Sequence, residues 1–475
     1  MENAAAEYSI KGILKQLLTY KSGVFGISLL VLLILISVYT MITIPYSTAI
    51  ELWRGGENVW IENPRNAQPT WIRYLGKNLP ETIKRDSTQA GRVGTIKVLT
   101  PIPERNMKLL HISFSFDYEY DDFPSEINIF FTSKYNTSAP LLRIYWIKPS
   151  GTKINLMTYI PRSQEERLSL SINPTVSNRL YAYTVNVLGG EPQVPLLVEQ
   201  AMFAMEDETM NSTLTATPMK GKYELIIEGT LYGEDSDVDA KLIVYGKVYG
   251  LAGTDHLRRD LTVALLWGTP IALSFGLTAS LTISLLQLLI ATISGYYGGK
   301  VDSAIQRLTE GYMILPFLPF LILIATFYRL DIWILLLVII VLSVFGGGVK
   351  STRALVMQIK EYPYIEAAKA YGASSKRIIL LYIIPKILPP IVPGLIGSVP
   401  GYVFLEAALS LLGLGDPYLP SWGKIIEDSY AGGALYKGHY YWVLEPASML
   451  ILTALAFSFL GFALDKIVNP KLREV

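Results

Sequence analysis

The chain has 475 residues, of which 51% are hydrophobic, and this composition excludes an ordinary soluble protein. Its formal net charge of +1 gives no bulk affinity for nucleic acid. The absence of cysteine excludes disulfides, thiolate catalysis and cysteine metal sites. The three histidines lie far apart in the sequence, so no metal site is predicted.

The N-terminal part is typical of a short cytoplasmic segment followed by a membrane helix. Residues 1–23 are polar and carry lysines, whereas residues 24–45 form an uninterrupted apolar run. A run of about twenty residues can span a bilayer, and it is longer than the apolar core of a signal peptide. We therefore expect a retained transmembrane helix whose lysine-rich end is cytoplasmic.

Residues 46–250 have lower hydropathy and a different pattern. Alternating apolar runs begin near residue 108, are separated by turn-forming residues, and include LYAYTVNV at residues 180–187. This spacing predicts an all-β, sandwich-like domain with one helix over residues 194–205. Because the domain follows the first span, it is expected to be extracellular.

Two Asn-x-Ser/Thr triplets, at Asn136 and Asn211, fall inside this domain. Such triplets are acceptors for N-glycosylation on exposed loops. Together with the absence of cysteine, they suggest a glycoprotein from a glycosylating prokaryote such as an archaeon.

Residues 251–475 hold five further apolar segments, which makes six expected transmembrane helices. The loop of residues 350–386 is strongly basic, whereas residues 413–445 are acidic. The positive-inside rule therefore places that loop and both termini in the cytoplasm of a multi-pass cell-membrane protein. The segments cover residues 266–294, 312–328, 332–348, 387–412 and 442–464.

The basic loop predicts an amphipathic helical hairpin at the membrane surface. Pro363 suits a first helical position, Gly372 is typical after a helix C-terminus, and Ser374 can cap a second helix. Such a hairpin is a structure that a partner protein can push on. An apolar stripe recurs at i, i+3, i+4 and i+7: Tyr364, Ala367, Ala368 and Tyr371.

The same loop resembles the EAA signature of ABC importer permeases. The matching residues are Glu366-Ala367-Ala368, then Gly372, then Tyr382-Ile383-Ile384-Pro385, with Tyr382 and Ile384 departing from the usual form at apolar positions.

Three further elements are similar to C-type permease subunits of the dipeptide/oligopeptide/nickel class. GTDHLRRD (residues 253–260) resembles GTD-x-x-GRD, with Arg258 in place of the usual glycine, which predicts a different local turn. Its acidic and basic residues predict an ion-paired turn into the next helix. LSLLGLGDPYLPSWG (residues 409–423) and the ending FSFLGFALDKIVNPKLRE also match. Residues from about 50 to 250 lie outside the resemblance and look like an insertion.

The resemblance implies a type I ABC importer permease fold and a non-enzymatic chain. It implies half of a heterodimeric pathway for oligopeptides or similar solutes such as oligosaccharides. The implied partners are a second permease subunit, two ABC ATPase subunits that bind ATP and Mg²⁺, and an extracellular solute-binding protein; no cofactor is implied in this chain. In this family the hairpin seats in a cleft on the ATPase. The implied coupling residues are Tyr364, Ile365, Glu366, Ala367, Ala368, Tyr371, Gly372 and Pro385.

The stretch from Gly346 to Thr352 superficially resembles a phosphate loop, but Val349 stands where glycine must precede the lysine. The three glycines are instead expected to allow close helix packing or a helix end. The polar residues at membrane depth are candidates for the translocation pathway: Gln287, Ser398 and Glu406. For Glu406, a structural hydrogen-bonding role is an equal alternative.

Two other functional classes compete with an importer subunit. A membrane-anchored surface recognition protein would use the β domain as its functional part, and co-purification with an ATPase discriminates between the two. A secondary transporter typically has inverted repeats with interrupted helices, which are not evident in the sequence.

Overall fold

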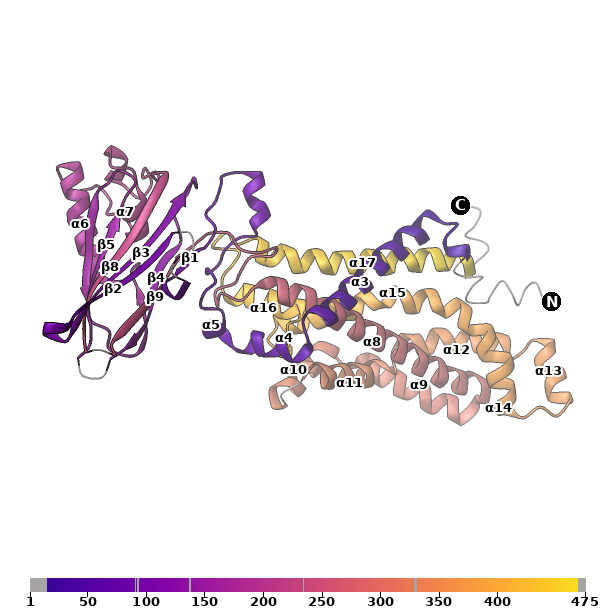
Figure 1. The fold of residues 1–475 in the computed structure, drawn as a ribbon. Coiled ribbons are helices and arrows are strands. Elements are labelled where there is room, and N and C mark those ends of the chain that lie inside the picture. The colour runs from indigo at the N-terminus through magenta and orange to yellow at the C-terminus, as the bar shows by residue number, and fades with distance from the viewer. Residues whose placement is uncertain are drawn as a thin grey trace. The chain divides into compact units, whose positions relative to one another are not determined.

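A computed structural model describes residues 15–468 except 90, 92, 93, 136, 137, 234, 329 and 330. The chain divides into two compact units (Figure 1). The helical unit comprises Met1–Arg54 and Val263–Val475, and the β unit comprises Gly55–Thr262. The β unit is therefore an insertion that follows the first long helix.

Among the described residues, four helices are long and apolar enough to cross a membrane. There are up to six such spans if each of two bent helix pairs is one span. The four are α3 (Lys21–Thr43), α8 (Leu261–Tyr297), the continuous run Ser375–Leu411 and α17 (Tyr441–Val468). The run Ser375–Leu411 contains α14 (Ser375–Ile378) and α15 (Ile384–Leu411). The remaining helices of this unit are α4 (Tyr46–Arg54), α9 (Gly299–Ile314), α10 (Phe317–Phe327), α11 (Ile332–Ser343), α12 (Gly347–Ile359), α13 (Pro363–Ala370) and α16 (Trp422–Ala431).

The third and fourth spans were expected to be single helices, but in the structure each is a bent pair of helices. Helices α9 and α10 are bent by 78°, and Pro316 lies at the break because proline cannot continue a helix. Helices α11 and α12 are bent by 48°, and the break ends at Gly346, the N-cap of α12. The three glycines at residues 346–348, which were expected to allow close packing or a helix end, therefore lie at the N-terminus of α12.

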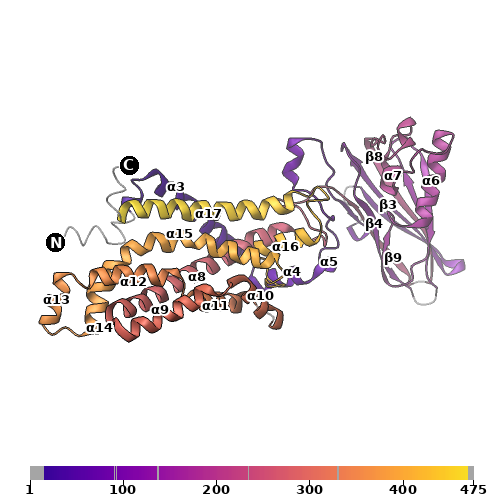
Figure 2. The same ribbon diagram turned by 180° about the vertical axis from the view of Figure 1, so that it is seen from behind.

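The first span packs against the last (Figure 2). A Cβ on Gly26 would lie 2.8 Å from the backbone nitrogen of Leu460 and 3.0 Å from the carbonyl oxygen of Ala456. The rings of Phe25 and Phe459 meet edge to face with centroids 5.1 Å apart. Because small residues let membrane helices approach closely, α3 belongs to the bundle and is more than a separate anchor.

The β unit holds two antiparallel sheets whose inner faces enclose one hydrophobic core. One sheet has the order β1-β9-β4-β7 and the other β2-β3-β8-β5-β6. This confirms the predicted β-rich insertion; β1 and β2 had no counterpart in the predicted strands. The strands are β1 (Ile83–Asp86), β2 (Thr95–Ile102), β3 (Met107–Tyr118), β4 (Glu126–Lys134), β5 (Leu141–Ile147), β6 (Lys153–Tyr159), β7 (Glu165–Ser169), β8 (Gly221–Tyr232) and β9 (Asp237–Tyr245).

The strand predicted over residues 180–187 is wrong, because these residues belong to helix α6 (Pro174–Leu188). The Asn173 side chain accepts hydrogen bonds from two backbone N–H groups of the first turn, and Gly189, at φ +68°, ends the helix. These start and stop signals outweigh the alternation of aromatic and small residues. The helix expected over residues 194–205 is present as the shorter α7 (Val198–Phe203).

Arg258 occupies the position where the GTD-x-x-GRD pattern has glycine. Its φ of +64° lies in the left-handed region, which glycine adopts readily and other residues rarely do. Its fully buried side chain forms ion pairs with Glu57 (3.2 Å) and Glu126 and donates to the carbonyl of Asn63 (2.7 Å). The guanidinium carbon lies 4.6 Å from the centre of the Tyr245 ring.

These contacts join the two ends of the insertion to its sheet. Burial alone raises the pKa of Glu126, but the Arg258 guanidinium brings that pKa below its ordinary value. The neighbouring Arg259 forms an ion pair with Asp255 at 2.5 Å, which confirms the ion-paired turn before α8.

We predict that Gly26→Leu destabilises the helical unit by about 2 kcal/mol or more, because the added side chain meets the α17 backbone. Gly311→Leu on α9 is the matched control, because a Cβ there meets nothing within 4 Å. The unfolding temperature of the purified chain in detergent measures both effects. Equal unfolding temperatures for the two variants would contradict the close α3–α17 contact.

We predict that Arg258→Gly destabilises the β unit although it relieves a left-handed arginine. The relieved strain amounts to about 1–2 kcal/mol. Both carboxylates lose a buried guanidinium, although Glu57 keeps Arg65 and Glu126 keeps Arg167. This loss costs at most about 3–5 kcal/mol, so the net loss is at most about 1–4 kcal/mol. Denaturant unfolding of the full chain, followed by near-UV circular dichroism, measures it. Arg65→Ala is the control, since Arg65 pairs with Glu57 from a half-exposed position and should lose less than about 1 kcal/mol.

Candidate functional site

The surface hairpin is a short helix with well-defined ends. Helix α13 begins with Pro363, as predicted. At its C-terminus, the N–H of Ala373 bonds to the carbonyl of Ala368 at 3.0 Å. The N–H of Gly372 bonds to the carbonyl of Lys369 at 2.9 Å. With Gly372 at φ +77°, this is a Schellman motif, which fixes the direction of the chain after the helix.

The predicted apolar stripe is divided between two faces of α13. Ile365 and Ala368 are buried in a core cluster of the helical unit, whereas Tyr371 is 92% exposed and Tyr364 is 40% exposed. Ala368 therefore holds the hairpin to the bundle, and the outer face is left for a partner. The core that receives the helix contains Leu288, Val356, Ile359, Ile378, Ile383 and Ile387. The exposed face carries Tyr364, Glu366, Ala367 and Tyr371.

The second half of the hairpin runs directly into a membrane span. The Ser374 side chain accepts a hydrogen bond from the Arg377 N–H at 3.4 Å, as its predicted capping role requires. The next turn, Ile379–Ile383, is a π-helix. Pro385 follows it with an exposed side chain. A proline ring conflicts with the carbonyl four residues earlier in a regular α-helix, and a widened turn avoids this conflict.

Gln287 and Ser398, two of the three pathway candidates, line one cavity of about 340 Å³ between α8, α12 and α15. The Ser398 hydroxyl lies 2.7 Å from the Ser280 hydroxyl. Gln287 donates to the carbonyl of Ser343 at 2.9 Å, beside the α11–α12 break. A Cβ on Gly348 would overlap the Gln287 side chain, so this glycine allows the close approach that the sequence predicted.

Glu406 does not line this cavity. Its carboxylate is 4% exposed and accepts hydrogen bonds from the hydroxyls of Ser421 (2.9 Å) and Ser410 (3.2 Å). Ser421 is also the N-cap of α16, accepting the Lys424 N–H at 3.2 Å. These contacts favour the structural alternative, in which Glu406 fastens the start of α16 to α15.

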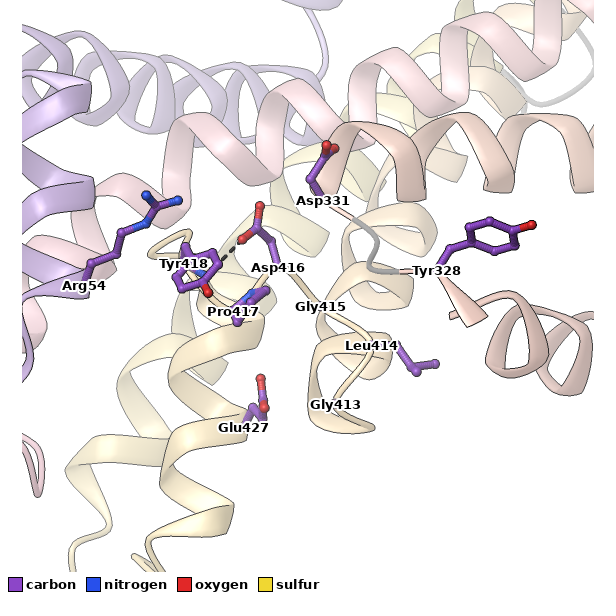
Figure 3. Close-up of a pocket in the computed structure, with 10 residues that line it drawn as sticks. All are labelled: Arg54, Tyr328, Asp331, Gly413, Leu414, Gly415, Asp416, Pro417, Tyr418 and Glu427. Carbon is purple, nitrogen blue, oxygen red and sulfur yellow. Dashed lines mark hydrogen bonds between the residues drawn. The ribbon is translucent and has the colours of Figure 1, made fainter. Parts of the chain in front are cut away.

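A second, open pocket of about 560 Å³ lies at the end of the bundle opposite the hairpin (Figure 3). The Arg54 guanidinium lies 4.3 Å from the centre of the Tyr418 ring, and Asp416 accepts the Tyr418 N–H at 2.9 Å. Asp331 and Glu427 add two more carboxylates to its wall. None of these residues was among the predicted pathway residues, although the family-like element GLGDPY supplies most of the lining.

The predicted glycosylation sites fall in the β unit. Asn136 lies outside the described residues. Asn211 ends a short 3-10 helix (Glu208–Asn211), and its side-chain oxygen accepts the backbone N–H of Gln193 at 2.9 Å.

Membrane-length helices, a surface hairpin and an open cavity among α8, α12 and α15 are features of a membrane transport component, a permease. Residues 287–474 match the family described as binding-protein-dependent transport system inner membrane component. The chain belongs to this family, which is non-catalytic and spans the membrane several times, and the predicted resemblance is confirmed.

Several known proteins are similar to this chain. The dipeptide transport system permease protein DppC of Bacillus subtilis is 34% identical over 225 residues, covering 47% of this chain and 69% of DppC. The oligopeptide transport system permease protein OppC of Escherichia coli K12 is 35% identical over 221 residues, covering 46% and 72%. A structure of the inward-facing MetNI methionine ABC transporter matches 44% of this chain and 98% of that chain, with a TM-score of 0.34 and 18% identity.

We predict that Glu406→Gln leaves both the unfolding temperature and solute uptake near wild type, because the amide oxygen still accepts from the two serines. Glu406→Ala leaves buried hydroxyls without an acceptor and should cost about 1–3 kcal/mol of stability. Unfolding in detergent and uptake of a labelled oligopeptide by cells measure the two effects. Loss of uptake in Glu406→Gln at unchanged stability would instead assign the carboxylate to the pathway.

Proposed function

We propose that the chain is one of two permease subunits of an ATP-driven ABC importer for oligopeptides or similar small solutes such as oligosaccharides. The observation that carries the proposal is the hairpin. Its helix has the EAA signature, is anchored in the core by Ile365 and Ala368, and exposes two tyrosine side chains to solvent. The names of the similar permeases, which transport dipeptides and oligopeptides, support peptides as the solute class.

In this proposal, the outer face of α13 is the contact for an ATPase subunit. Exposed aromatic side chains beside small residues suit a protein groove, and Glu366 supplies a charge for a basic partner residue. ATP and Mg²⁺ belong to the two ATPase subunits. Because α13 is packed into the bundle core, a displacement of the hairpin moves the membrane helices between two states.

The remaining parts of the importer follow from the same family. A second permease subunit completes the pathway, and a solute-binding protein delivers solute from outside. Both termini and the hairpin are cytoplasmic, and the β unit is extracellular, where it docks the binding protein or gates the pathway. N-glycosylation of Asn136 and Asn211 and an archaeal source belong to this proposal as well.

The competing function is a membrane-anchored recognition protein whose β unit is the functional part. Its support is the independent core of the β unit. Against it stand the packing of α3 on α17 and the open cavity between α8, α12 and α15, neither of which an anchor requires.

The test is a pull-down from native membranes, compared between wild type, Gly372→Val and Gly372→Asn. Wild type should recover an ATPase, a second permease and a solute-binding protein. Gly372→Val should reduce ATPase recovery up to about tenfold, because a β-branched residue resists φ +77° by about 1–2 kcal/mol. Gly372→Asn tolerates that conformation and is the matched control. Recovery of the wild-type chain without an ATPase would overturn the proposal in favour of the recognition protein.

A further inference from the structure

Helix α12 contacts both the hairpin and the open cavity that Gln287 and Ser398 line. Its C-terminal residues Val356 and Ile359 share one core cluster with Ile365 and Ala368 of α13. One face of α12 forms part of the cavity wall through Gly348, Ser351, Thr352 and Leu355. A movement of the hairpin therefore reaches the cavity along this helix.

A bidentate ion pair holds α12 to α9. Arg353 Nε lies 2.5 Å from one oxygen of Asp302, and a second guanidinium nitrogen contacts the other oxygen. Asp302 also accepts the Ser294 hydroxyl of α8 at 2.5 Å, and Gln306 of α9 donates to that hydroxyl at 3.3 Å. The two charged side chains are only 26% and 18% exposed. One network thus joins α8, α9 and α12.

The geometry makes this pair stronger than an ordinary surface pair. Two parallel N–H···O bonds to a planar guanidinium fix both distance and orientation. A second pair between the same helices, Lys350–Glu310 at 3.3 Å, is 40% and 59% exposed and monodentate. Exposed single-contact pairs contribute about 0–1 kcal/mol, so Arg353 carries most of the polar attachment.

The other end of α12 is a natural pivot. The chain bends by 48° between α11 and α12. Gln287 holds the end of α11 through the Ser343 carbonyl, and Gly348 passes directly against the Gln287 side chain. Helix α12 thus has a break at its N-terminal end and the Asp302–Arg353 ion pair near its middle, so we expect it to tilt as a rigid body.

We propose that Asp302 and Arg353 are positioning residues of the transport cycle, which make α12 tilt with α9 so that displacement of the hairpin changes the width of the cavity. The inference rests on the proposed function, because it takes the hairpin as the site where the ATPase acts. Without the pair, α12 moves with the hairpin but slips along α9, and ATP hydrolysis loses its effect on the cavity.

The experiment uses the full complex and spin labels across the cavity. The chain has no cysteine, so Leu355→Cys on α12 and Gly394→Cys on α15 give the only label pair in this chain. A Cβ at Gly394 meets nothing within 4 Å, so the substitution to cysteine displaces no neighbour there. Double electron–electron resonance then compares the label distance with and without ATP and vanadate, alongside the ATPase rate.

In the wild-type background, nucleotide should shift this distance. Arg353→Ala and Asp302→Ala should keep ATPase recovery and hydrolysis but lose more than half of the shift, and Arg353→Lys, which keeps the charge without the planar fork, should lose part of it. The exchange Asp302→Arg with Arg353→Asp should restore the shift. Lys350→Ala, on the same helix, should leave it unchanged.

Three outcomes would overturn the inference, and they are distinguishable. A full shift in Arg353→Ala with the ATPase bound would show that the pair transmits nothing, while the proposed function stands. A shift equally reduced in Lys350→Ala would assign the effect to general surface charge. Absence of any ATPase from the wild-type complex would overturn the proposed function, and this inference with it.

Discussion

Close approach of helix backbones holds the helical unit together, and the position of every functional group depends on it. In lipid, burying apolar side chains between helices gains little, because the tails are equally apolar. Small residues at the crossings supply van der Waals contact instead: Gly26 against α17, Gly276 against Val399 and Val403 of α15, and Gly295 against Val356 of α12. The hairpin, the Asp302–Arg353 ion pair and the cavity are all formed by helices that these contacts position.

The parts that the sequence predicted are those whose signals are local. Pro363, Gly372 and Ser374 mark the ends of the hairpin helices within one or two turns, and the apolar runs mark the spans. The strand predicted over residues 180–187 was wrong although its signals were also local. Asn173 and Gly189 lie outside the alternating run, so a reading of the run alone misses them.

Other features depend on partners that are distant in the sequence. The Arg258 side chain meets Glu57 and Glu126, which are 201 and 132 residues away, so no local pattern reveals that its charge is paired. The division of the hairpin stripe depends on which face meets α12, and periodicity cannot choose between Ala368 and Ala367. In the sequence, Arg353 is one of many basic residues of the loop, and only the fold brings Asp302 beside it.

The Arg258 network also constrains the order in which this chain acquired its insertion. An arginine in a buried left-handed turn, without acidic partners, would carry both backbone strain and an unpaired charge. The carboxylates of Glu57 and Glu126 belong to the inserted segment, so the arginine became tolerable only after that segment was present. Once it was in place, a return to glycine would remove their one fully buried cation and leave those acids with only the partly exposed Arg65 and Arg167. The substitution is thus entrenched, because replacing Arg258 alone lowers the stability of the inserted domain.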